Sequence, residues 1–244
     1  MTMANLYVGT SGYSYSAWRG QFYPAGVPQK EWLAFYARIY NAVEINATFY
    51  RPFAKSVFAH WRDMTPPEFR FVLKGPKVIT HEKRLDDVSE ELKAFVSSAA
   101  ALEDKHAATL WQFSAGVKMD DLGERFVQFL QMLPNDVKQV FEFRHPSWFT
   151  ENTYDLLNQF GAGFVINDSP HLKSTEAVTD HIMYVRFHGP DKLYDSLYSD
   201  EQLRTWADKI KPRLSENDCY LFFNNTFAGQ GLQNALQLRD LLLK

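Results

Sequence analysis

The sequence predicts an α/β protein folded as a TIM-like (β/α)8 barrel of parallel strands. Eight short apolar runs alternate with amphipathic stretches, which is the pattern of repeated βα units. Six of these runs also carry polar residues in only one of their two alternating phases. A length of 244 residues fits one such domain spanning 1–244. A doubly wound open sheet is the alternative.

The predicted strands share short runs of Val, Ile, Leu and aromatic residues. They are 6–9, 42–46, 69–74, 108–113, 139–144, 161–168, 182–187 and 219–224. The segment 169–180 has no apolar period. The helix between the sixth and seventh strands is therefore predicted to be missing.

Helices are predicted between the other strands from apolar spacing and capping residues. Residues 29–40 place Trp32 and Tyr36 on one face, and Asp86 or Asp87 is expected to cap the helix that buries Phe95. Thr150 and Ser199 are predicted to begin helices, and Gly161 is predicted to end one. The last helix is expected to turn Leu232, Leu236 and Leu242 inward.

The phase of the polar residues distinguishes a barrel from an open sheet. In the strand 139–144, Phe141 and Phe143 alternate with Glu142 and Arg144. In a barrel the apolar phase faces the helices and the mixed phase faces the axis, whereas an open sheet covered on both faces is apolar in both phases. Six strands with this alternation favour the barrel. Cys219 lies in the apolar phase and is predicted to be a small core residue.

Polar residues gather late in the strands, where barrel active sites lie. The candidates for substrate binding are Glu44, Asn46, Tyr50, Lys74, Gln112, Arg144, His145, Arg186, Asn224 and Asn225. The candidates for proton transfer are Glu142, His188 and Asp168. Because a buried charge needs a partner, these residues form either a self-satisfied ion-pair network or a site for an anionic ligand.

Several of these assignments keep a structural alternative. Arg144 and Arg186 either bind the ligand or pair with Glu142 and Glu44, and Asp168 either acts in catalysis or caps a turn. If Glu142 is the general acid or base, Glu142→Gln is expected to leave the fold intact and abolish turnover. A large loss of stability would instead identify a structural ion pair.

The long segment 10–24 after the first strand is rich in aromatic residues. Tyr13, Tyr15 and Trp18 are predicted to form a lid over the mouth, with anchoring of the loop as the alternative. Glu44, Glu142, Asp168 and His188 have suitable chemistry for a metal, but neighbouring Lys and Arg residues disfavour a divalent cation. No metal or cofactor is expected.

Six ordered blocks resemble the YecE-like family of uncharacterised proteins. They are "GTSGYSYSAWRGQFYP", "VEINATFYR", "FVLKGPKVITHEKRL", "FEFRHPSW", "YVRFHG" and "FFNNTFAGQGLQNALQL". The resemblance covers nearly the whole chain and implies a TIM-barrel-like fold without a known reaction. Members of that family often have prolines after the Gln of the fourth strand, whereas "WQFSAG" here keeps Gln112 and lacks them.

The leading hypothesis is an enzyme acting on a phosphate- or carboxylate-bearing substrate, with hydrolysis favoured among the reaction classes. One alternative is a nucleic-acid-binding or processing protein that uses Arg19, Arg51, Lys77 and Arg84, and another is a non-catalytic ligand-binding barrel. A net charge of −3 does not favour nucleic acid. The single cysteine and the lack of a signal peptide or membrane span predict a cytoplasmic protein without a membrane partner.

Overall fold

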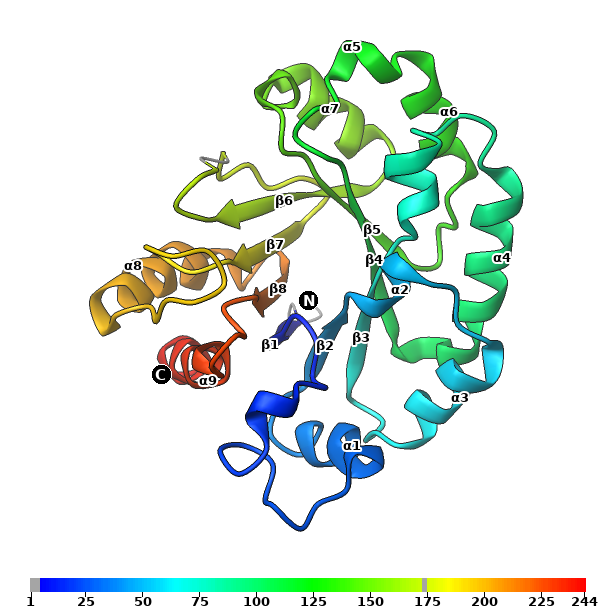
Figure 1. Ribbon diagram of the computed structural model, residues 1–244. Coiled ribbons are helices and arrows are strands. Elements are labelled where there is room, and N and C mark those ends of the chain that lie inside the picture. Colours follow the sequence, from blue (N-terminus) through cyan, green and yellow to red (C-terminus); the bar gives the residue numbers. More distant parts are fainter. Residues whose placement is uncertain (1–4, 173–174) are drawn as a thin grey trace.

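The computed structural model describes residues 5–172 and 175–244, and it confirms the parallel (β/α) barrel (Figure 1). Its strands are β1 (Leu6–Thr10), β2 (Ala42–Ile45), β3 (Arg70–Lys74), β4 (His106–Gln112), β5 (Lys138–Glu142), β6 (Ala162–Asp168), β7 (Ile182–Phe187) and β8 (Asp218–Phe223). Each strand from β2 to β7 pairs in parallel with the next one in the chain, and β1 pairs with β8. The carboxyl ends of all eight strands therefore meet at one end of the barrel.

Helices lie around the outside of the strands (Figure 1). They are α1 (Trp32–Tyr36), α2 (Ala47–Tyr50), α3 (Lys55–Asp63), α4 (Ser89–Ala99), α5 (Met119–Leu122), α6 (Glu124–Met132), α7 (Glu151–Gln159), α8 (Asp200–Ile210) and α9 (Gln230–Leu242). Shorter turns of 3-10 helix are η1 (Ser16–Trp18), η2 (Gln29–Glu31), η4 (Ala100–Lys105), η5 (Pro146–Trp148) and η6 (Lys211–Arg213), and η3 (Val78–Glu82) is a π-helical turn.

The predicted caps are confirmed at two helices and wrong at a third. The Thr150 side chain accepts a hydrogen bond from the Thr153 amide, and Ser199 forms a capping box at the start of α8. Neither Asp86 nor Asp87 caps α4, because Val88 precedes its first residue and Asp87 has a φ of +44°. The helix predicted over 29–40 is divided into η2 and the short α1.

The connection between β6 and β7 contains no helix in residues 169–172 and 175–181, as predicted. Thr179 holds the last part of this connection against β6. The Thr179 hydroxyl donates to the carbonyl of Ala162 at 2.6 Å and accepts from the amide of Phe164 at 2.8 Å. Side-chain hydrogen bonds therefore anchor this loop directly to the sheet.

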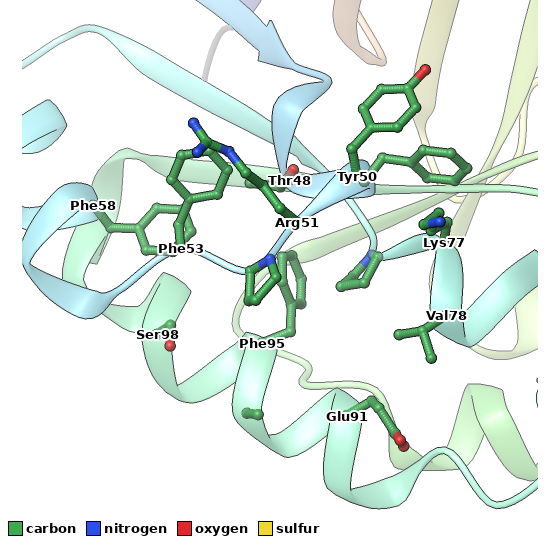
Figure 2. Close-up of a pocket in the computed structure, with 14 residues that line it drawn as sticks. Thr48, Tyr50, Arg51, Phe53, Phe58, Lys77, Val78, Glu91, Phe95 and Ser98 are labelled. Carbon is green, nitrogen blue, oxygen red and sulfur yellow. The ribbon is translucent and has the colours of Figure 1, made fainter. Parts of the chain in front are cut away.

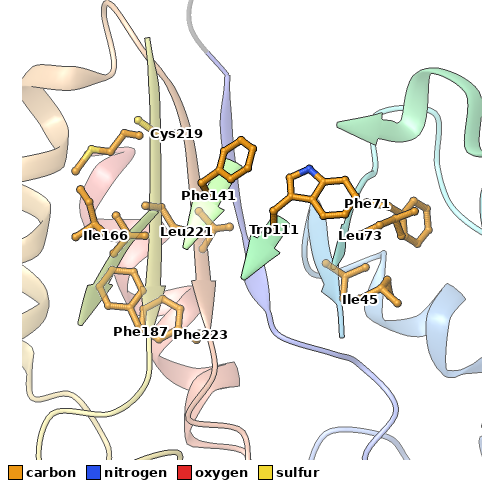
Figure 3. Close-up of a cluster of buried hydrophobic side chains, with 14 of the residues drawn as sticks. Ile45, Phe71, Leu73, Trp111, Phe141, Ile166, Phe187, Cys219, Leu221 and Phe223 are labelled. Atoms are coloured by element: carbon orange, nitrogen blue, oxygen red, sulfur yellow. The ribbon is translucent and has the colours of Figure 1, made fainter. Parts of the chain in front are cut away.

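The strand residues divide into two buried layers, as their alternating phases predict. The layer inside the barrel includes Ala42, Val72, Leu110, Val140, Val165, Tyr184 and Phe222. The other phase packs outward against the helices, and Figure 3 shows Phe71, Trp111, Phe141, Leu221 and Phe223 in that layer. Cys219 lies there too, and burial raises the pKa of its thiol to about 12, which confirms a core role.

The barrel closes between β1 and β2 mainly through side chains, with a backbone bridge between Ser11 and Glu44 just beyond the end of β1. We call this junction the β1–β2 seam. Asn41 accepts from the amide of Val8 at 2.9 Å and donates to the carbonyl of Leu6 at 2.7 Å. The Tyr36 hydroxyl accepts from the amide of Thr10 at 2.8 Å and donates to the carbonyl of Ala42 at 3.2 Å. The strands are so close that a Cβ on Gly9 would lie 2.0 Å from the carbonyl oxygen of Ala42.

Candidate functional site

Arg186, near the end of β7, is the centre of a buried ion-pair network at the carboxyl end of the barrel. Its guanidinium forms a two-point contact with Glu44, through Nε to Oε2 at 3.0 Å and Nη2 to Oε1 at 2.7 Å. Its Nη1 donates to Glu142. Ser11 and the Tyr184 hydroxyl each donate to Glu44 at 2.7 Å. Arg186 and Glu44 are both buried and mutually satisfied.

Glu142, at the end of β5, lies between two arginines. Arg144 Nε donates to its Oε1 at 2.8 Å, and Arg186 holds its other oxygen. Burial raises the pKa of Glu142. The positive charges of Arg186 and then Arg144 lower it by more than burial raises it, so the pKa is well below its usual range. Glu142 therefore stays ionised at neutral pH. This arrangement supports the structural ion pair over a role in proton transfer.

Lys74 ends β3 and is only 6% exposed. Within the part of the chain that the structure describes, no hydrogen bond or ion pair engages its ammonium group; the group lies 4.0 Å from the centre of the Phe49 ring. Thr48 fixes this arrangement, because its hydroxyl bonds to the carbonyls of Ile45 and Lys74 and so holds α2 against β3. Burial, followed by the charge of Arg186, lowers the pKa of Lys74 to about 8.

His81 packs on the same aromatic ring as Lys74. It lies in η3, and its ring centre is 4.9 Å from that of Phe49. Nδ1 is 2.8 Å from the Thr80 hydroxyl. Burial, and then the charge of Lys74, lower the pKa of His81, so it is neutral at pH 7. His81 is not among the site residues predicted from the sequence, because only the fold of η3 brings it to the barrel mouth.

His188, which follows β7, has both ring nitrogens occupied. Nε2 is 3.0 Å from Asn167 Oδ1, and Nδ1 is 3.0 Å from Asn224 Nδ2. These contacts suit a neutral ring that donates through Nε2 and accepts through Nδ1. Burial, and then the charge of Arg186, lower the pKa of His188 to about 3. A satisfied structural histidine is therefore the better description.

Two predicted site residues face away from the barrel mouth. Asp168 accepts from the Trp206 indole at 2.7 Å and so faces α8, because the inward phase of β6 passes through Val165 and Asn167. Asn225 is buried and donates to Ser196 and Asn234, which ties a loop to α9. Neither side chain is therefore placed to contact a ligand in the barrel mouth.

Trp18 and His145 also have structural roles. Trp18 is fully buried and donates to the carbonyl of Thr226 at 3.0 Å, so it anchors the loop 10–24 and is not a lid. His145 accepts from the amide of Ser147 at 3.1 Å and caps η5 on the rim. Tyr13 and Tyr15 are half-buried, and the Tyr15 hydroxyl donates to the carbonyl of Ser11 at the site edge.

Because Asp168 faces α8, its negative charge does not contribute to the barrel mouth. The remaining groups are three cations, Lys74, Arg144 and Arg186, and two carboxylates, Glu44 and Glu142. One positive charge is in excess when Lys74 is protonated. Both carboxylates are engaged by arginines, so the unpaired charge belongs to Lys74.

Further polar and aromatic groups surround this charge. Gln112 ends β4 and is 7% exposed, and Asn46 Oδ1 is buried without a hydrogen-bond partner among the described residues. Tyr50 at the end of α2 is exposed, as are Tyr194 and Phe227 in the segments that follow β7 and β8. The mouth therefore combines a cation, amide groups and an aromatic rim.

An apolar cavity of about 310 Å³ adjoins the site on the outer side of α2 (Figure 2). Phe53, Phe58 and Phe95 line it, and Arg51 lies 4.7 Å from the centre of the Phe53 ring. Phe49 also lines the cavity, so one side chain contacts both Lys74 and this space.

Family comparison agrees with this architecture. Residues 7–244 match the family model described as "Protein of unknown function DUF72". The chain belongs to the DUF72 family. The YecE-like resemblance is confirmed by two relatives named UPF0759 proteins. YunF of Bacillus subtilis is 23% identical over 97% of this chain and 94% of its own length, and YecE of Escherichia coli is 26% identical over 90% and 86%.

Solved DUF72 structures have the same fold. A DUF72 family protein from Thermotoga maritima is 32% identical, covers 98% of this chain and 100% of its own, and superposes with a TM-score of 0.83. One from Enterococcus faecalis is 22% identical, with 98% and 96% covered and a TM-score of 0.84. The DUF72 name brings no reaction with it, so the chemistry must be argued from the site.

Two observations on this DUF72 chain concern metals and membranes. Across residues 5–172 and 175–244, no three His, Cys, Asp or Glu side chains converge as a metal site would require. Among the same residues, no helix is long and apolar enough to cross a bilayer.

Proposed function

We propose that the carboxyl end of this DUF72 barrel binds a small anion bearing a phosphate or carboxylate group, and that the protein is an enzyme acting on it. The observation that carries the proposal is the Lys74 ammonium, which belongs to a side chain only 6% exposed and has no acceptor among the described residues. A buried unpaired charge is costly, and an anionic ligand would remove that cost.

The neighbours of Lys74 suit the rest of such a ligand. Arg144 uses only Nε to contact Glu142 and is 30% exposed, which leaves its two terminal nitrogens for a planar anion. Gln112 supplies an amide at the end of the neighbouring strand β4. The ligand is therefore held from two sides, by Lys74 on β3 and by Arg144 just after β5.

Lys74 and His81 are better placed than Glu142 or His188 to transfer protons. The carboxylate of Glu142 is held ionised by two arginines, and both ring nitrogens of His188 are occupied. The pKa of Lys74 is lowered to about 8, and His81, whose pKa is lowered from its ordinary value by burial and then by Lys74, shares contact with Phe49. Hydrolysis that depends on Glu142 as the base thus has less support than chemistry at Lys74.

The nucleic-acid alternative gains no equal support. Lys77 pairs with Glu82 at 2.9 Å, and Arg51 stacks on Phe53, so these two members of the suggested basic group are already engaged.

Isothermal titration with inorganic phosphate, citrate and pyruvate tests the anion site. Wild type and Lys77→Met are expected to bind at least one of these anions, and Lys74→Met is expected to lose at least tenfold in affinity. Lys77 is the matched control because it is a nearby lysine, 46% exposed, that is paired with Glu82. Equal binding by wild type and Lys74→Met, or no binding of any anion by wild type, would overturn the proposal.

A further inference from the structure

We propose that Lys74 forms a covalent imine with the carbonyl carbon of a small anionic aldehyde or ketone bound at the barrel mouth. This inference rests on the proposed anion site and names both its substrate class and its reaction class. The substrates are compounds in which a carbonyl lies close to a carboxylate or phosphate, such as 2-oxo acids and phosphorylated aldehydes.

The first support is the position of the amine. Lys74 is 94% buried at the end of a barrel strand, where substrates reach barrel active sites. Arg186 is locked by Glu44 and Glu142, and Arg144 is held by Glu142, so both serve as fixed charges. Among the cations of the barrel mouth within residues 5–172 and 175–244, Lys74 is the one that has no hydrogen-bond or ion-pair acceptor.

The second support is the environment of the amine, which makes its neutral and nucleophilic form easier to reach than in an exposed lysine. The face of Phe49 lies 4.0 Å below Nζ and excludes water from that side. Arg186 and Arg144 add positive charge nearby, and Glu142 and Glu44 oppose them while remaining paired to arginine. Burial beside other cations is a known way to activate a lysine for imine formation. The lowered pKa of Lys74, about 8, agrees with this environment.

The third support is a neutral proton acceptor beside the amine. His81 contacts the same Phe49 ring, and its Nδ1 is engaged by Thr80, which leaves Nε2 to exchange protons. Arg144 and Gln112 would hold the anionic group of the substrate, so the adjacent carbonyl lies toward Lys74. The charged and titratable groups that face Lys74 are therefore Glu44, Glu142, Arg144, Arg186 and His81.

The reaction balances without any oxidant or reductant. The neutral amine attacks the carbonyl carbon, a C–N bond forms, and the carbonyl π electrons move to oxygen, which takes a proton from the solvent to give a carbinolamine whose nitrogen is still protonated. His81 accepts a proton from the nitrogen and returns it to the hydroxyl group, which leaves as water. The products are a protonated imine on Lys74 and one water molecule.

Borohydride trapping tests this inference directly. The full-length protein is incubated with pyruvate, reduced with sodium borohydride and analysed by intact mass and peptide mapping. Wild type and Lys77→Arg are expected to gain one 1-carboxyethyl group, located at Lys74. Lys74→Arg, which keeps the positive charge but cannot form an imine, is expected to gain none. Phosphate is expected to suppress the labelling by competition.

Lactate separates this inference from the anion site, because it has the carboxylate of pyruvate but no carbonyl. If pyruvate and lactate both bind and pyruvate is not trapped, imine formation is overturned and the anion site stands. If none of phosphate, citrate, pyruvate and lactate binds and nothing is trapped, both proposals fail. Labelling of Lys74→Arg to the wild-type level would show reaction at other lysines and would also overturn the inference.

Discussion

Both carboxylate oxygens of Glu142 belong to the ion-pair network, because Oε1 accepts from Arg144 and Oε2 accepts from Arg186. A carboxylate in this position stabilises the fold mainly by compensating two cations that burial would otherwise make costly. The residue-scale question is therefore what happens when one member of the network is made neutral.

Glu142→Gln is expected to lower the free energy of unfolding by about 3–5 kcal/mol, because it leaves Arg186 with one carboxylate and Arg144 with none. Chemical denaturation monitored by fluorescence measures the change. The control is Glu82→Gln, which breaks an exposed pair with Lys77 and should cost less than about 1 kcal/mol. A stable Glu142→Gln variant would restore the catalytic hypothesis for this residue.

Lys74→Met is expected to stabilise the protein at pH 7, on the order of 1–3 kcal/mol. The pKa of Lys74 is about 8 in the folded state and 10.5 in the unfolded state, so folding opposes its protonation. In the wild type this penalty is complete below pH 8 and disappears as the pH rises toward 10.5. Thermal denaturation at pH 7 and pH 10 should show the gain of Lys74→Met shrinking at the higher pH. A destabilised variant at pH 7 would contradict the assignment of an unpaired charge.

His188 is expected to make stability depend on pH between 6.5 and about 3. Its pKa is lowered in the folded state, so the unfolded chain binds a proton first and stability is lost as the pH falls below 6.5. One such group contributes about 1.4 kcal/mol per pH unit. His188→Asn should reduce this slope by one proton in denaturation curves recorded from pH 7 to pH 4. An unchanged slope would show that another group is responsible.

At the scale of secondary-structure elements, the β1–β2 seam is the place where the barrel departs from a regular ladder. The side chains of Asn41 and Tyr36 occupy positions that backbone groups fill elsewhere in the sheet. Glu44 is next to this seam, since its carbonyl accepts from the amide of Gly12 at 2.7 Å. The seam therefore helps to position a carboxylate of the ion-pair network.

Asn41→Ala is expected to destabilise the protein by about 1–3 kcal/mol, because it leaves the amide of Val8 and the carbonyl of Leu6 without their partner. Hydrogen exchange should show the largest loss of protection in β1 and β2. Asn5→Ala removes an exposed hydrogen bond to Asp218 on the β8 side and should cost less. Equal effects of the two substitutions would argue against a special role for the seam.

At the scale of the whole molecule, the polar and apolar phases of the strands were enough to predict the barrel. Alternate residues of a strand face opposite sides of the sheet, and six strands confined their polar residues to one of these two sides. The pairs of Arg144 with Glu142 and of Arg186 with Glu44 were expected only as an alternative to ligand binding, because no pattern within a strand selects between the two and Arg186 and Glu44 lie 142 residues apart in the sequence. Which charge meets which depends on strand tilt and side-chain length, and neither is visible in a single strand.

The misplacement of Asp168 has a simpler cause. Asn167 and Val165 share the inward phase of β6, so Asp168 must face outward, and this phase was present in the sequence. The prediction relied on the position of Asp168 at the end of its strand and not on the face of the strand to which its side chain belongs. His81 is a different case, since nothing in "KVITHEKRL" predicts a π-helical turn.

The pairing of β1 also has a consequence for the order of folding during synthesis. Within the described residues, the backbone ladder of β1 is formed with β8, which is the last of the eight strands in chain order. Of these strands β1 leaves the ribosome first, so it waits longest for its partner, while β2 to β7 can already pair in sequence. Until Asp218–Phe223 has emerged, the edges of β1 and β2 are exposed to other chains, so a stalled or truncated product is expected to be prone to aggregation.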